Sequence, residues 1–185
     1  MKELSLNILD ISQNSISAQA TLIQIIIEES LDQLRISIID DGIGMSEDFL
    51  QTVTDPFRTT RSTRKVGMGI PLFKLAAEQT GGNLVITSKT AESFPESHGT
   101  TIVASFNKRH LDFTPLGDII STIIILIQGN PQIDFLFKHS TPGHETIELD
   151  TREVREVLGS EIPLNSFDVL EWIRGSLEEQ YGYNN

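Results

Sequence analysis

The residues with the clearest chemical potential begin at the end of one predicted strand. Residues 36–45 read ISIIDDGIGM, so a run of apolar residues ends in Asp40 and Asp41 and enters the pair Gly42 and Gly44. A carboxylate is a hydrogen-bond acceptor only, and glycines let the backbone turn sharply and approach a flat ligand closely. The arrangement predicts a site that grips the edge of a base or a sugar.

A second glycine pair, Gly67 and Gly69, stands at the start of a predicted helix with Pro71 in its first turn. Exposed amides and the helix dipole favour an anion there, and glycines allow phosphate oxygens to come close. The surrounding chain supports this interpretation, because residues 56–77 contain no Asp or Glu but carry five basic side chains: Arg58, Arg61, Arg64, Lys65 and Lys74. In an acidic protein, they predict an anion nearby.

Each signal is also compatible with an ordinary structural role. Asp40-Asp41-Gly42 is a common hairpin turn, and the second glycine pair could provide only a flexible helix entry. Asp10 and Asn14, one helical turn apart, are compatible with a solvated polar stripe. A calcium loop of the EF-hand type is excluded, because the alternating acidic ligands and the terminal glutamate are absent. The order of the motifs therefore decides between the interpretations.

That order resembles the GHKL superfamily of ATP-binding domains, which includes gyrase, the large heat-shock chaperones, mismatch-repair ATPases, histidine kinases and anti-sigma-factor kinases. The resemblance covers residues 4–106. It rests on motifs in this order: Asp10-x-x-x-Asn14, Asp40-x-Gly42-x-Gly44, Asp55-Pro56-Phe57, Thr59-Thr60-Arg61, Gly67-x-Gly69 and Gly99-Thr100. It implies that the protein binds ATP together with Mg²⁺.

At the adenine end, the resemblance implies three roles. Asp40 corresponds to the aspartate that accepts a hydrogen bond from the adenine amino group. Gly42 and Gly44 correspond to the turn beneath the base, and Thr100 resembles the threonine beside the same edge.

At the phosphate end, Asn14 corresponds to the asparagine that coordinates Mg²⁺. Gly67 and Gly69 correspond to the glycines at the phosphates. Residues 59–65 resemble the mobile lid that closes over the nucleotide, and they include Arg61 and Lys65. Spacing does not select which basic residue meets the γ-phosphate, and the candidates are Arg58, Arg61, Arg64 and Lys65.

Asp10 stands where the hydrolytic members carry a glutamate that activates water. Aspartate is one methylene shorter, which weakens its case as a general base. Phosphorylation or regulation of a partner protein therefore ranks first, with a serine/threonine kinase of the anti-sigma kind as the first enzymatic hypothesis, and slow ATP hydrolysis ranks third. Few residues precede the first motif, so we expect no phosphoacceptor helix and no autophosphorylation of the sensor-kinase kind.

The elements that position these residues follow from hydrophobic periodicity. We expect a helix over residues 3–17, a short helix capped by Ser46 and a helix over 69–79, with strands over 21–29, 34–40, 83–89 and 100–106. This order predicts an α+β fold, a two-layer α/β sandwich with a mainly antiparallel sheet and helices on one face. We expect the ATP-binding domain to cover residues 1–108.

Residues 109–185 are expected to form a small, acidic α/β accessory unit. From residue 110 onward there are 4 basic and 13 acidic side chains, against 10 and 13 in residues 1–109. The expected elements are a buried helix over 116–128, strands over 132–138 and 146–149, a helix over 152–158 capped by Thr151, and a final helix capped by Asn165 or Ser166 that carries Trp172 and Tyr181 as core or interface residues. This half carries the alternative hypothesis, a non-enzymatic regulatory adaptor that binds a partner protein.

Composition limits the kinds of partner, metal site and cellular location that we expect. The net charge of −12 argues against nucleic acid as a partner, and the absence of cysteine excludes disulfides and thiolate metal sites. There is no run of 18 apolar residues, and Met1-Lys2-Glu3-Leu4 lacks the layout of a secretory signal. We therefore expect a cytoplasmic protein without membrane contact, and no metal other than nucleotide-bound Mg²⁺.

Overall fold

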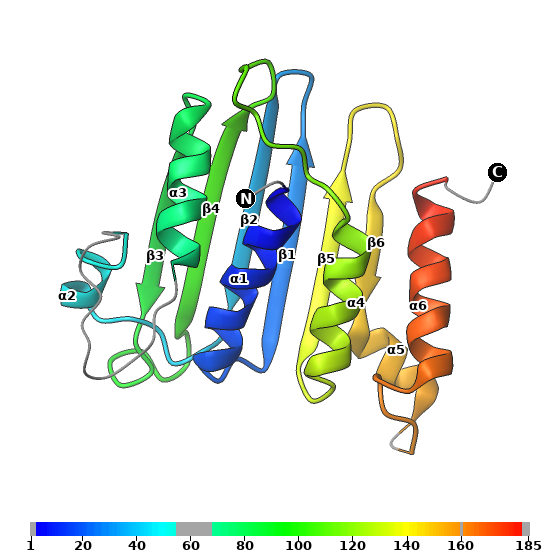
Figure 1. Ribbon diagram of the computed structural model, residues 1–185. Coiled ribbons are helices and arrows are strands. Elements are labelled where there is room, and N and C mark those ends of the chain that lie inside the picture. Colours follow the sequence, from blue (N-terminus) through cyan, green and yellow to red (C-terminus); the bar gives the residue numbers. More distant parts are fainter. Residues whose placement is uncertain (1–2, 55–67, 160, 183–185) are drawn as a thin grey trace.

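The computed structural model describes residues 3–54, 68–159 and 161–182 (Figure 1). In these segments the helices and strands follow one another in this order: α1 (Leu4–Ser17), β1 (Leu22–Glu29), β2 (Gln33–Asp40), α2 (Glu47–Leu50), α3 (Gly69–Gln79), β3 (Asn83–Lys89), β4 (Gly99–Asn107), α4 (Ile119–Gly129), β5 (Asp134–Ser140), β6 (Ile147–Asp150), α5 (Thr151–Leu158) and α6 (Phe167–Gln180).

The six strands form one sheet in the order β3-β4-β2-β1-β5-β6. Four neighbouring pairs are antiparallel, and β1 and β5 run parallel with Leu22 opposite Asp134. Helices α1, α3 and α4 cover one face of this sheet (Figure 1). The predicted two-layer sandwich with a mainly antiparallel sheet is therefore confirmed.

The core lies between the sheet and these helices. In β1 the side chains of Ile23, Ile25 and Ile27 are buried, and the residues between them are only half-buried, as the twofold period of a strand requires. The buried helix side chains that complete this core include Leu4, Ile8 and Ile11 of α1, Phe73 of α3 and Ile123 of α4. Each such side chain contributes about 1.5–3 kcal/mol when it leaves water.

The C-terminal half is joined to the N-terminal half through the sheet itself. Strand β5 pairs with β1, and buried residues from both sides of position 108 belong to one hydrophobic cluster. The division into residues 1–108 and 109–185 stays a prediction about domains. None of the helices in the described segments combines the length and apolarity that a membrane crossing requires.

Helix α4 begins at Ile119, three residues later than predicted. Asp118 is the cause, because its side chain accepts a hydrogen bond from the Ser121 amide at 2.9 Å and so caps the helix. The acidic cap is a stronger start signal than the apolar Leu116, which Gly117 and Asp118 separate from the aliphatic run that begins at Ile119.

The cap of α5 was predicted one residue too late. Asp150, not Thr151, accepts the hydrogen bond from the Arg152 amide, at 3.0 Å. The Thr151 hydroxyl turns inward instead, where it accepts from the Phe135 amide at 2.8 Å and donates to Asp134 at 3.0 Å. Thr151 thus ties α5 to the start of β5.

The C-terminal helix α6 has the predicted place but not all of the predicted packing. Ser166 occupies its N-cap position, although the side chain makes no cap hydrogen bond. Tyr181 packs partly against the core, whereas Trp172 is 60% exposed. A core role for Trp172 was therefore wrong, and the alternative of an interface role stays open.

Candidate functional site

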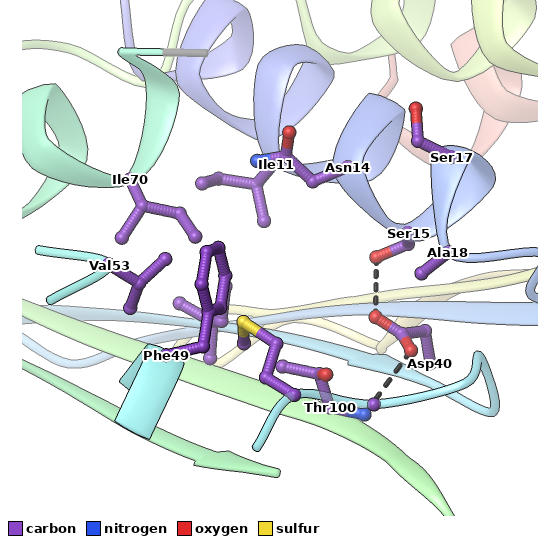
Figure 2. Close-up of a pocket in the computed structure, with 13 residues that line it drawn as sticks. Ile11, Asn14, Ser15, Ser17, Ala18, Asp40, Phe49, Val53, Ile70 and Thr100 are labelled. Atoms are coloured by element: carbon purple, nitrogen blue, oxygen red, sulfur yellow. Dashed lines mark hydrogen bonds between the residues drawn. The ribbon is translucent and has the colours of Figure 1, made fainter. Parts of the chain in front are cut away.

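A pocket of about 240 Å³ opens between α1, the ends of β2 and β4, and α2 (Figure 2). Its floor forms because β2 and β4 are neighbours, with Asp40 directly opposite Thr100. The residues that line it are Ile11, Asn14, Ser15, Ser17, Ala18, Asp40, Gly44, Met45, Phe49, Val53, Ile70, Thr100 and Ile102. Four of the predicted site residues are therefore brought together here: Asn14, Asp40, Gly44 and Thr100.

Asp40 is the most firmly held polar group in the pocket. Its Oδ1 accepts a hydrogen bond from the amide of Gly42 at 2.9 Å. Figure 2 shows the other two bonds, from the Thr100 amide to Oδ1 at 3.2 Å and from the Ser15 hydroxyl to Oδ2 at 2.6 Å. These donors come from three separate segments, so the orientation of the buried carboxylate is fixed. A carboxylate has about four lone-pair sites, which leaves one acceptor position for a ligand.

The neighbouring Asp41 has a structural role. It accepts hydrogen bonds from the amides of Thr21 at 2.7 Å and Leu22 at 2.9 Å, and from the Thr21 hydroxyl. Burial raises the pKa of Asp41, but these hydrogen bonds outweigh burial and leave the pKa below its ordinary value. Asp41 therefore joins the end of β2 to the start of β1, and Asp40 alone faces the pocket.

The turn after these aspartates needs its glycines. A Cβ on Gly42 would lie 2.8 Å from the Ala18 carbonyl oxygen, and a Cβ on Gly44, where φ is +72°, would overlap the Lys89 carbonyl. The Gly42 carbonyl also accepts a hydrogen bond from Nδ1 of His98, at 2.7 Å. The turn thus packs backbone against backbone, between the end of α1 and the loop after β3.

The remaining wall of the pocket is apolar, which suits a flat ring. Phe49, Val53 and Ile70 face Ile11 across the cavity in Figure 2. Sequence reasoning missed these residues because they are scattered over α1, α2, the turn after α2, and α3.

It also missed Ser15, the hydroxyl that orients Asp40. A signal was present, since Ile11, Asn14, Ser15 and Ala18 have the i, i+3, i+4, i+7 spacing of one helix face.

The predicted phosphate end is only partly described. Asp10 is exposed on α1, and a Cβ on Gly69 would lie 3.1 Å from the Asp10 Cβ, so Asp10 sits against the N-terminus of α3. Neither residue lines the pocket. The predicted lid over residues 59–65, with Arg61 and Lys65, lies outside the described residues, as does Gly67.

The described residues fit a Mg²⁺ ion that takes most of its ligands from phosphate and water. Asn14 lines the pocket, and its side-chain nitrogen Nδ2 is buried without a hydrogen-bond partner in the described part of the chain. No hydrogen bond through Nδ2 therefore holds the side chain away from a metal ion. The side-chain oxygen of Asn14 is the hard ligand that Mg²⁺ prefers. No group of three His, Cys, Asp or Glu side chains that could hold a metal by itself occurs among the described residues.

Known proteins similar to this chain point to one family. The family model for histidine kinase-, DNA gyrase B- and HSP90-like ATPases matches residues 1–110. The sensor protein KdpD of Clostridium acetobutylicum is 31% identical over 94 aligned residues, and the match covers 48% of this chain and 10% of that protein. The chain therefore spans about a tenth of the length of this curated relative.

Solved structures with less sequence identity show the same fold. The N-terminal domain of a DNA repair protein has a TM-score of 0.57 and 19% identity, over 86% of this chain and 58% of that chain. The Aquifex aeolicus MutL ATPase domain complexed with ADP has a TM-score of 0.54 and 13% identity, over 95% of this chain and 88% of that chain. The latter likeness extends through the C-terminal half.

Proposed function

The chain belongs to the family of histidine kinase-, DNA gyrase B- and HSP90-like ATPases, and we propose that it binds ATP with Mg²⁺ and phosphorylates or regulates a partner protein. One observation carries the nucleotide part of the proposal. Asp40 is a buried carboxylate that three donors hold in place, with one acceptor position left over a pocket that has an apolar wall.

This geometry supports adenine rather than guanine as the base. The exocyclic amino group of adenine is a donor that matches the free acceptor position of Asp40. Guanine presents a carbonyl oxygen at the same ring position, and two acceptors that face each other leave both unpaired. In this proposal, Thr100 lies beside the same edge and Gly42 and Gly44 form the turn beneath the ring.

The phosphate end of the proposal rests on fewer described residues. Asn14 supplies the protein oxygen for Mg²⁺, which neutralises phosphate charge when it is bound. Gly69 packs closely against Asp10 at the N-terminus of α3, and Asp10 is the residue we propose as general base. Arg61, Lys65 and Gly67 keep their proposed roles at the phosphates.

Calorimetry tests the nucleotide site. Wild-type protein titrated with Mg-ATP should show saturable binding, and Mg-GTP should bind at least about tenfold more weakly because its base lacks the matching donor. Asp40→Asn should abolish ATP binding, whereas Asp112→Asn, the same change on an exposed loop, should not. Equal affinities for ATP and GTP, or an unchanged affinity in Asp40→Asn, would defeat the proposal.

The second candidate function is the non-enzymatic adaptor, which the acidic C-terminal half and the short Asp10 side chain favour. ATP labelled at the γ-phosphate, incubated with the full chain and a cell extract, separates the two functions. A kinase transfers label to a protein, and an adaptor transfers none. Turnover of ATP by wild type and Asp10→Ala addresses slow hydrolysis, which should fall in the variant if Asp10 activates water.

The charge of the protein supports the proposal that its partner is a protein rather than nucleic acid or a membrane surface. A net charge of −12 repels phosphate backbones and anionic lipids. A cytoplasmic location remains part of this proposal.

A further inference from the structure

A second concave surface lies at the far end of the sheet from β3, where α5 and α6 flank the edge strand β6 (Figure 1). It is a groove of about 770 Å³, larger than the pocket at Asp40. We call it the acidic groove. Its lining includes Glu148 and Asp150 of β6, Glu153 and Val157 of α5, Ile162, and Asp168 and Trp172 of α6.

The rim of the acidic groove is apolar and exposed to solvent. Val157 is 88% exposed, Trp172 is 60% exposed and Ile162 is 47% exposed. Buried side chains lie below them, among which Val154 and Val169 belong to the core cluster. Large apolar side chains that gather around a concave surface are typical of a binding groove rather than of scattered surface residues.

The same groove carries uncompensated negative charge. Glu148 forms an ion pair with Lys138 at 2.8 Å, and Asp150 with Arg152 at 2.6 Å. Glu153 and Asp168 form no ion pair in the described part of the chain. They lie in a half of the protein whose net charge is −9, so a complementary ligand is both apolar and basic.

The edge of β6 is closed to a partner strand. The Gln180 side chain accepts a hydrogen bond from the Glu148 amide at 2.8 Å and donates to the Glu148 carbonyl at 3.2 Å. These are the outward-facing backbone groups that an added strand would need, and covering them is a common protection of sheet edges. A helix uses no backbone hydrogen bonds to bind, so this block does not affect it.

We propose that the acidic groove binds a basic amphipathic helix of a partner protein. The apolar face of the helix covers Val157, Ile162 and Trp172, and its Lys or Arg residues face Glu153 and Asp168. A second copy of this chain is a poor occupant, because two halves with a net charge of −9 repel each other. The inference goes beyond the proposed function and does not depend on nucleotide binding.

Trp172 is the only tryptophan of the chain, so its fluorescence reports directly on the groove. The probe is an amphipathic 18-residue peptide of Leu and Lys, and the control is its counterpart with Glu in place of Lys. The Leu/Lys peptide should shift the Trp172 emission to shorter wavelength, and the shift should saturate as peptide is added. The affinity of the peptide should fall at least about tenfold between 0.05 and 0.5 M salt, since screening weakens charge pairs. Circular dichroism should show that the peptide becomes helical. No binding, or a bound peptide that is not helical, would overturn the proposal.

Paired variants of the full chain separate groove binding from general attraction to an acidic protein. Val157→Lys should weaken peptide binding at least about tenfold, whereas Leu111→Lys, on a side chain 96% exposed outside the groove, should not. Glu153→Gln with Asp168→Asn should weaken it more than Glu92→Gln with Glu96→Gln, which removes the same charge elsewhere. Equal effects within either pair would overturn the proposal.

Two further measurements identify which hypothesis has failed. The Asp40→Asn protein should keep its affinity for the Leu/Lys peptide even though it has lost ATP, so each proposal can fail alone. Sedimentation of the wild type should show a monomer. A wild-type dimer that Val157→Lys dissociates would mean that a second copy occupies the groove, and it would overturn the proposal.

Discussion

The pocket at Asp40 and the acidic groove are built in opposite ways. In the pocket the carboxylate of Asp40 is buried and hydrogen-bonded to Ser15 and Thr100, and apolar residues form the facing wall. In the acidic groove the apolar residues stand at the rim in contact with water, and two carboxylates have no ion-pair partner in the described structure. The two surfaces therefore suit ligands of different size, because a preformed polar network selects a small molecule and an open apolar rim favours a protein.

The two surfaces also depend differently on the rest of the fold. Asp40, Thr100 and Ser15 come from β2, β4 and α1, so the pocket exists only if the sheet register is correct. The rim of the acidic groove belongs to α5, α6 and the connection between them, and much of it is exposed. Substitutions should therefore cost more folding stability at the pocket than at the groove rim.

The largest effect is expected for Gly44→Ala beneath the pocket. The new Cβ would overlap the Lys89 carbonyl at a φ of +72°, so the free energy of unfolding should fall by about 3 kcal/mol or more. Gly81→Ala is the matched control, because its φ is +78° but no atom lies within 4 Å of the new Cβ; a loss of about 1 kcal/mol is expected there. Urea unfolding measures both, and equal losses would show that the turn at Gly44 is not tightly packed.

A pair of valines on α5 tests the groove through the same quantity, the free energy of unfolding. Val154 is 7% exposed and belongs to the core, so Val154→Ala should lower the free energy of unfolding by roughly 2 kcal/mol. Val157→Ala, one helical turn later on an exposed site, should change it by less than about 0.5 kcal/mol. If urea unfolding gave a comparable loss for Val157→Ala, the rim would serve folding rather than binding.

Ser15→Ala should weaken ATP binding without preventing folding. It removes the donor to Oδ2 of Asp40, and a lost hydrogen bond to a charged group corresponds to an affinity loss of roughly tenfold. Ser17→Ala is the control within the same pocket, because the Ser17 hydroxyl donates only to the Gln13 carbonyl of its own helix, at 2.9 Å. Calorimetry should separate the two variants, and similar affinities would mean that Asp40 needs no orienting hydroxyl.

The smallest effect is expected at a buried contact between the N-terminal and C-terminal halves of the chain. His139 of β5 is buried, with Nε2 3.0 Å from the carboxylate of Glu29 on β1 and Nδ1 2.7 Å from the Tyr181 hydroxyl beyond α6. Burial lowers the pKa of His139, and the hydrogen bond with Glu29 offsets this only in part. Because the folded-state pKa lies below the unfolded value of about 6.5, the stabilising contribution of neutral His139 is complete above pH 6.5.

That contribution should be lost as the pH falls from 6.5 through the folded-state pKa. The midpoint of urea unfolding should therefore decrease modestly over this range, and His139→Gln should flatten the decrease because glutamine does not titrate. A profile that is identical in the variant would show that protonation of His139 does not oppose folding.

Much of the fold was predictable because its signals are local. Periodicity and turn residues alone predict the helix over residues 3–17, the hairpin that presents Asp40, and the strands over 83–89 and 100–106. Errors occurred where two local signals competed, as with Asp118 against the aliphatic run before α4 and Asp150 against Thr151 at α5. In both places the aspartate forms the cap.

The order of the motifs and the acidic surplus of the C-terminal half can be read from the sequence alone. Through the family resemblance, the sequence also led to Asn14, Asp40, Gly44 and Thr100, which share one pocket in the structure. The folded protein was needed to see that Asp40 and not Asp41 faces the pocket, that Ser15 orients Asp40, and that β5 continues the sheet beside β1. These features depend on interactions of long range along the chain. Periodicity and capping act within a few residues, whereas the pairing of β1 with β5 and the bond from Ser15 to Asp40 join segments distant in the chain, whose contacts depend on packing of the whole core.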